Sequence, residues 1–217
     1  MKNIVYDRGY LKTLSDYIEQ TFWSEIEKYP QINEHYKQKI DVRFLSDTDR
    51  LWEHRFERHK GHFTRKYVRE SFSSKLSFSF ETMCFYECIR DDGICHIYRM
   101  YLNVNMEQLL TNMFSRISTL DTQTEDHIKH MIKISVRHEV GHILDWINDV
   151  DNKHMDHVNN KKKINTSTLN EFYSIMDTLS DEELHIRYYS QIPDERSANE
   201  LVGLTPQDFL FKSEKEN

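Results

Sequence analysis

The sequence has little glycine and proline, and it has no long apolar run. Five glycines and three prolines among 217 residues are too few for the many tight turns of a β-sandwich or barrel. Helices with a small sheet are therefore expected. No apolar run approaches the ~20 residues of a membrane-spanning helix, and residues 1–11 lack the apolar stretch of a secretion signal. We expect neither a membrane segment nor export.

Cysteine is also scarce. The three cysteines, Cys84, Cys88 and Cys95, are an odd number, which does not suit a disulfide framework. They fall in a strand-like stretch with loose spacing, so buried thiols are favoured over a second metal site that they would form with His96. We therefore expect a reducing compartment, the cytoplasm.

Positive charge is not in excess. The formal net charge is -7, whereas nucleic-acid binding requires a basic surface, so we expect no nucleic-acid partner. The 12 tyrosines, 12 phenylalanines and 3 tryptophans supply enough apolar area for a folded core. A chain of 217 residues fits one domain, residues 1–217. The sequence does not indicate an oligomeric state.

Apolar spacing, capping patterns and turn residues predict the order of helices and strands. Helices dominate this order, and the strands precede most of them. The predicted elements are a helix at 10–28, a strand at 40–44, a charged helix at 49–71, a hairpin with arms 76–89 and 94–106, a long helix at 122–147, a loop at 148–166, and helices that start at Thr168, Ser180 and Pro193, the last ending at Gly203.

One motif in the long predicted helix carries chemistry. It is His138-Glu139-Val140-Gly141-His142, an H-E-x-x-H pattern. Two histidines four positions apart share one face of a helix, where both can bind a Zn²⁺ ion. The acid between them, Glu139, is then expected to act as general base on a metal-bound water that attacks a carbonyl. The motif predicts zinc-dependent hydrolysis.

A catalytic zinc site needs a third protein ligand. The best candidate is Glu195, because Asn199 lies one turn later on the same predicted helix face. The Asn199 side chain would accept the second ring N–H of His138 and fix its tautomer. The residues leave several alternatives open for the third ligand: Glu200, Asp145, Asp149, His154, Asp156 and His157.

Two stretches together resemble a known family. Arg137–His142 reads R-H-E-x-G-H, and Glu195–Asn199 reads E-x-x-A-N. With Leu102-Asn103 ahead of them, they resemble the ImmA/IrrE-like metallopeptidases of the gluzincin branch of zincins, over about residues 95–203. This resemblance implies a peptidase with a zinc ion, acting on a cytosolic protein substrate. It also implies that an extended peptide binds along an edge strand, for which we expect Tyr101–Asn105.

A second similarity concerns the long interval of 53 positions between His142 and Glu195. Anthrax-lethal-factor-like zincins are similar in this interval and in having a tyrosine ahead of the ligand glutamate. That resemblance implies a catalytic role for Tyr188, as a donor to the oxyanion. Tyr189 and His185 are the alternatives for this role.

These patterns converge on an α+β, zincin-like fold with a small mixed sheet, an H-E-x-x-H active-site helix and a helical C-terminal part. We expect zinc-dependent peptide-bond hydrolysis, with His138, His142 and Glu195 as metal ligands and Glu139 and Tyr188 as catalytic residues. The alternative is a non-catalytic peptide-binding or regulatory protein that zinc staples together. A helical regulatory protein without metal, in which the motif is coincidence, is the third hypothesis.

Overall fold

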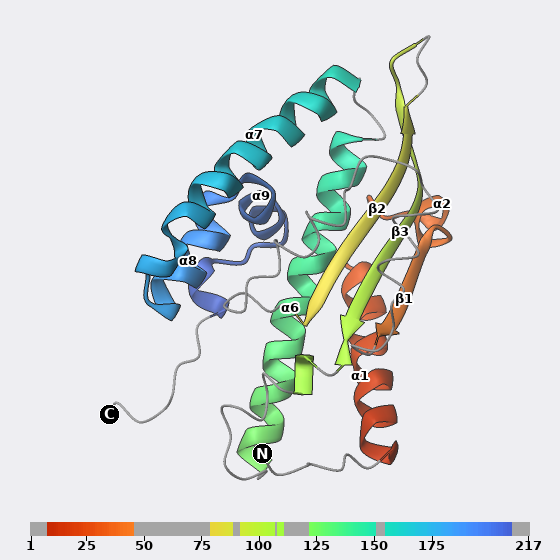
Figure 1. Ribbon diagram of the computed structural model, residues 1–217. Coiled ribbons are helices and arrows are strands. Elements are labelled where there is room, and N and C mark those ends of the chain that lie inside the picture. Colours follow the sequence, from red (N-terminus) through yellow and green to blue (C-terminus); the bar gives the residue numbers. More distant parts are fainter. Residues whose placement is uncertain are drawn as a thin grey trace.

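The described residues form a small sheet covered by helices (Figure 1). In this computed structural model they are residues 8–45, 79–88, 92–106, 108–110, 122–150 and 155–209. Helices α1 and α6 lie beside the sheet, and helices α7, α8 and α9 form a group on the far side of α6 (Figure 1). The architecture is therefore mixed α and β, as expected. The predicted charged helix at 49–71 lies outside the described residues.

Within the described residues, the sheet has three strands in the order β1-β3-β2. Strand β1 (Ile40–Leu45) runs parallel to β3 (Cys95–Asn105), and β2 (Phe80–Cys88) runs antiparallel to it. The predicted hairpin is confirmed, and Gly93 in its turn has a φ of 69°, a left-handed conformation that suits glycine.

The expectation that Tyr101–Asn105 is an edge strand was wrong. This part of β3 pairs with β1 on one side and with β2 on the other. A central and an edge strand have the same alternation of side chains, and the position of β1 depends on contacts far apart in the sequence. The edge beside α6 is β2 instead (Figure 1).

Helix α1 (Arg8–Ile26) confirms the predicted N-terminal helix. Its buried apolar side chains recur at helical spacing and face the core. They are Leu14, Ile18, Phe22 and Ile26. Helix α6 (Thr122–Asp149) confirms the long motif helix, and it packs against both α1 and β2. A short helix, α2 (Glu34–Lys37), connects α1 to the sheet and is capped by Asn33.

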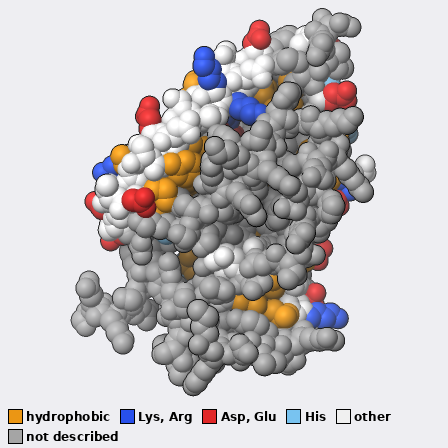
Figure 2. Space-filling view, viewed as in Figure 1, with side chains coloured by type: hydrophobic (Ala, Val, Ile, Leu, Met, Phe, Trp, Pro, Cys, Tyr) orange, Lys and Arg blue, Asp and Glu red, His pale blue; other side chains and the backbone are white. Residues whose placement is uncertain are grey.

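The predicted loop at 148–166 was wrong, because most of it belongs to helix α7 (Met155–Ile175). The Lys-rich run reads as a solvated loop, but Lys161 on it makes ion pairs with Asp145 and Asp149 of α6. The predicted helix start at Thr168 was also wrong, since the Thr168 hydroxyl donates to the Ile164 carbonyl inside α7. Figure 2 shows side chains of both charges along the surface of α7.

The C-terminal helices agree with their sequence signals. Ser180 and Glu183 form the expected capping box at the start of α8 (Asp181–Gln191). Helix α9 (Pro193–Val202) starts with proline at its first position, and Gly203 ends it with a φ of 68°. Two short 3₁₀ helices, Met176–Thr178 and Pro206–Phe209, flank this pair.

The cysteines differ in part from expectation. Cys84 keeps its thiol, whereas Cys95 is disulfide-bonded, so the prediction of a buried thiol was wrong at Cys95. The ladder of β2 and β3 places Cys88 directly opposite Cys95. The spacing of the cysteines in the chain gave no sign of this register. Among the described helices, none is both long and apolar enough to cross a membrane.

The ion pairs of Lys161 predict that this side chain helps to hold α7 against α6. Lys161→Met should lower the free energy of unfolding by about 2 kcal/mol, because the largely buried Asp145 loses its cation. Denaturant titration measures this, with Lys163→Met, which is exposed on the same helix, as the matched control. An equal effect of both substitutions would rule out the docking role of Lys161.

Candidate metal centre

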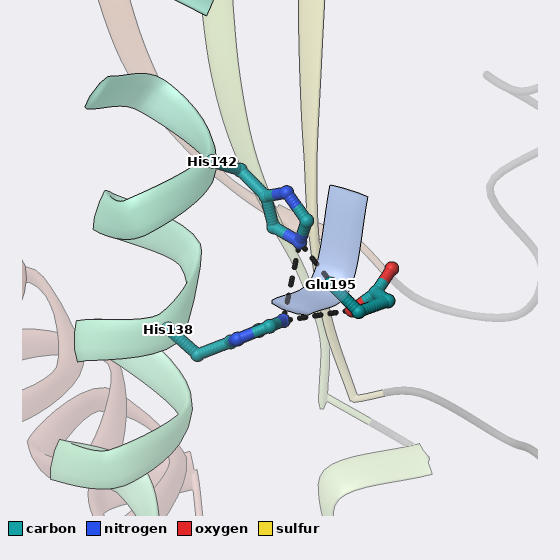
Figure 3. A group of neighbouring side chains, drawn as sticks. All are labelled: His138, His142 and Glu195. Carbon is teal, nitrogen blue, oxygen red and sulfur yellow. Dashed lines mark hydrogen bonds and ion pairs between the residues drawn. The ribbon is translucent and has the colours of Figure 1, made fainter. Parts of the chain in front are cut away.

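Helix α6 presents His138 and His142 on one face, one turn apart (Figure 3). Their Nε2 atoms lie 3.1 Å from each other, and their rings are nearly perpendicular, with centroids 4.7 Å apart. His138 is buried, at 4% exposed. Both rings therefore direct one nitrogen toward a common point.

Helix α9 brings a carboxylate to the same point (Figure 3). Oε2 of Glu195 lies 3.0 Å from Nε2 of His138 and 3.5 Å from Nε2 of His142. Ligands at the corners of a zinc tetrahedron, with bonds of about 2.0 Å, are separated by about 3.3 Å. The three donor atoms have this spacing, and the group could hold a metal ion.

The alternative third ligands lie elsewhere or are engaged. Asp145 accepts hydrogen bonds from Lys161 and from Ser197 of α9, each at 2.6 Å. Asp149 is ion-paired with Lys161 and lies 3.6 Å from His157. Of the remaining alternatives, Glu200 is solvent-exposed, Asp156 is exposed on α7, and His154 lies outside the described residues. Geometry therefore favours Glu195.

Asn199 orients the buried histidine, as its spacing predicts. Nδ1 of His138 donates to Oδ1 of Asn199 at 2.8 Å, which leaves the Nε2 lone pair free for a ligand bond. Asn199 is 2% exposed. Aromatic rings of Tyr189 and Phe209 pack edge-on against the His138 ring. The imidazole is thus fixed in both tautomer and orientation before any metal binds.

Tyr188 contacts the third ligand from behind. Its hydroxyl donates to Oε1 of Glu195 at 3.0 Å, while the other oxygen of that carboxylate faces the histidines. A phenol has one proton to donate, so Tyr188 cannot serve an oxyanion while it holds this bond. The structure brings Tyr188 to the site but gives it the geometry of a positioning residue.

A glycine allows α9 to reach α6. A Cβ built on Gly141, within the motif, would lie 2.2 Å from the Ala198 carbonyl oxygen and 2.7 Å from its carbonyl carbon. No side chain fits between these two backbones. Because the two backbones lie this close, both Glu195 and Asn199 reach the His138 ring.

The histidines and the carboxylate strongly perturb one another. Burial raises the pKa of Glu195, but His142 and His138 outweigh burial and hold this pKa well below its usual range. Burial lowers the pKa of His142, but the Glu195 carboxylate outweighs it and raises this pKa to about 9. Without metal, a proton therefore sits between His142 and Glu195 at neutral pH, in the place where a cation fits.

Two further acids face this centre. Glu139 is buried, at 6% exposed, next to the first ligand. Glu81, on the edge strand β2, was not found from the sequence. Burial, Glu139 and Glu195 together raise its pKa to about 8, against a smaller lowering by His142. The signal that could have identified Glu81 was an acidic residue within the predicted strand Phe80-Glu81-Thr82-Met83. The sequence could not show, however, that this strand lies beside α6.

Comparison with known proteins adds no relative: no family model matches the chain, and neither curated proteins nor solved structures give a match.

The pKa of His142 predicts how metal binding depends on pH. In the metal-free protein this pKa is about 9, above the ordinary 6.5, so the charged pair stabilises the fold fully below about pH 6.5 and loses this contribution as the pH rises through 9. A metal must displace the proton. Its affinity should rise about tenfold per pH unit between pH 7 and 9.

Calorimetry in two buffers of different ionisation enthalpy measures this proton release. Glu195→Gln removes the carboxylate that raises the pKa of His142, and the variant should release less than half a proton at neutral pH. Equal proton release by the two proteins would contradict the coupling between His142 and Glu195.

The contact between Gly141 and Ala198 predicts a penalty for a single methyl group. Alanine favours a helix by about 1 kcal/mol over glycine, yet Gly141→Ala should destabilise the fold by about 1–3 kcal/mol, because the methyl must displace backbone. Metal affinity should fall with it, as α9 moves away. Denaturant titration and metal competition measure both effects. Lys133→Ala, exposed on α6, is the control, and a Gly141→Ala protein as stable as this control would contradict the prediction.

Proposed function

We propose that this protein is a zinc-dependent peptidase with a zincin-like fold. The observation that carries the proposal is the convergence of His138, His142 and Glu195, whose donor atoms all lie within 4.8 Å of one another. Two imidazoles and one carboxylate are a typical ligand set for catalytic zinc. The resemblance of the same residues to the ImmA/IrrE-like metallopeptidases supports this proposal.

The number of ligands favours catalysis over a structural role. A structural zinc site has four protein ligands, whereas a catalytic site has three and keeps a position for water and substrate. Within the described residues, the ligand group has three members. A bound zinc ion would supply Lewis acidity, which polarises a substrate carbonyl and makes water acidic near neutral pH. The non-catalytic, zinc-stapled alternative does not account for the buried acid Glu139.

Glu139 is our candidate general base. It follows the ligand His138 directly on α6, and its carboxylate interacts electrostatically with His142 and Glu81, which places it at the ligand group. From there it can accept a proton from the attacking water and return it to the leaving amine. Tyr188 assists indirectly, because its hydrogen bond to Oε1 of Glu195 turns Oε2 toward the histidines.

The substrate would bind along β2. Among the described strands, β2 pairs only with β3, and its other edge lies on the side of α6 (Figure 1). An extended peptide can add to such an edge through backbone hydrogen bonds, with little dependence on sequence. We therefore propose a protein or peptide substrate held between β2 and the ligand group. The disulfide at Cys95 is typical of oxidising compartments, so the proposal does not include a cytoplasmic location.

Metal analysis and a matched set of variants test this function. The protein should bind about one zinc per chain, and His138→Ala should lose it. Glu139→Gln should retain zinc and lower peptide hydrolysis at least about 100-fold, because the general base is removed. Zinc content is measured by atomic spectroscopy and cleavage by mass spectrometry of a peptide mixture.

The control is His130→Ala, an exposed histidine on the same helix, which should keep both zinc and activity. Hydrolysis that survives Glu139→Gln would refute the general-base role. Zinc without hydrolysis in the unmodified protein would favour the stapled, non-catalytic protein instead.

A further inference from the structure

Glu81 is a carboxylate at the proposed substrate edge with no assigned role. It is the second residue of β2, directly opposite Asn103 of the central strand. It is partly buried, and its charge interacts with those of Glu139, Glu195 and His142. Glu81 therefore lies where an extended peptide on the β2 edge would pass the ligand group.

Within the described part of the chain, the carboxylate of Glu81 makes no ion pair, although His142 interacts with it electrostatically. Its side chain also accepts no hydrogen bond from a described residue. Arg43 lies in the same cross-strand row, but its guanidinium contacts other groups. The Arg43 guanidinium lies 3.7 Å from the Tyr101 ring centroid and 3.7 Å from Asp41. A partly buried carboxylate without a partner is costly, which is unusual unless a ligand supplies the partner.

Charge at the site points in the same direction. Glu81 interacts electrostatically with the carboxylates of Glu139 and Glu195 and, less strongly, with His142. Of these three acids, Glu81 is the one that is neither a proposed metal ligand nor the proposed general base. Burial and the two other carboxylates raise the pKa of Glu81 to about 8, so a cation placed beside this side chain would stabilise its charged form.

We propose that Glu81 determines substrate specificity by binding a cation of the peptide, an ammonium or guanidinium group, next to the bond that is cleaved. This inference rests on the proposed function. The cation can come from a lysine or arginine side chain or from the N-terminal amine of the peptide. Both present N–H donors and a positive charge to the carboxylate. The β2 edge would bind the backbone of the peptide with little dependence on its sequence, and Glu81 would add a preference for positive charge.

Binding to a protein that cannot cleave isolates this interaction from catalysis. The zinc-loaded full chain carrying Glu139→Gln is titrated by calorimetry with decapeptides of one parent sequence. The peptides contain lysine, norleucine or glutamate at one position, moved along the peptide, with the N-terminus free or acetylated. At one position the lysine peptide should bind at least about tenfold more tightly than its norleucine counterpart, as expected for a charged hydrogen bond.

Adding Glu81→Gln should reduce this preference to within about twofold. Adding Glu81→Lys should invert it, in favour of a glutamate peptide. The control is Glu87→Gln, an exposed glutamate on the same strand, which should leave the preference unchanged. Loss of binding on acetylation, rather than on replacing lysine, identifies the N-terminal amine as the cation.

A lysine preference that persists in Glu81→Gln would overturn the proposal, as would failure of the parent to distinguish any of the peptides. The proposed function is judged separately, by hydrolysis of the same peptides with Glu139 intact. Selective binding without hydrolysis would refute the proposed peptidase function and support Glu81 as a cation-binding residue. Hydrolysis without selectivity would support the peptidase and exclude the cation-binding role of Glu81.

Discussion

The close approach of α6 and α9 is the constraint on which the rest of the site depends. Gly141 and Ala198 bring the two backbones together where no further side chain fits. This contact sets the distance at which Glu195 meets the two histidines and at which Asn199 reaches His138. The link between Asp145 and Ser197 fixes the same two helices one turn further on. The ligand group is thus built by helix packing rather than by a loop.

Most residues of the candidate site could be predicted from the sequence, because they lie on the regular helices α6 and α9. The spacing of His138 and His142 fixes their common face once α6 is a helix. Likewise, Glu195 and Asn199 share a face of α9, so a single contact between helices satisfies both. The sequence does not show how the chain between α6 and α9 folds, so it could not fix which residue of the later segment reaches the histidines. For this reason Glu200 and several other residues stayed open as ligands.

Errors arose where distant contacts decide the local structure. The lysine-rich run became α7 because Lys161 meets carboxylates of α6, a contact that no local pattern encodes. Strand β3 became central because β1 returns to pair with it, and Cys95 is disulfide-bonded although cysteine spacing gave no sign of it. Glu81 was missed for the same reason: both β2 and α6 were predicted, but no local pattern shows that the edge of β2 lies beside α6.

The distribution of the ligands along the chain has a consequence for biosynthesis. His138 and His142 leave the ribosome together, but Glu195 follows 53 residues after His142, and its helix docks only when α9 is complete. A chain that stops earlier carries two imidazoles and no carboxylate to join them. The ligand group is therefore completed late in synthesis, and only a chain whose α9 has packed against α6 presents all three donor atoms together.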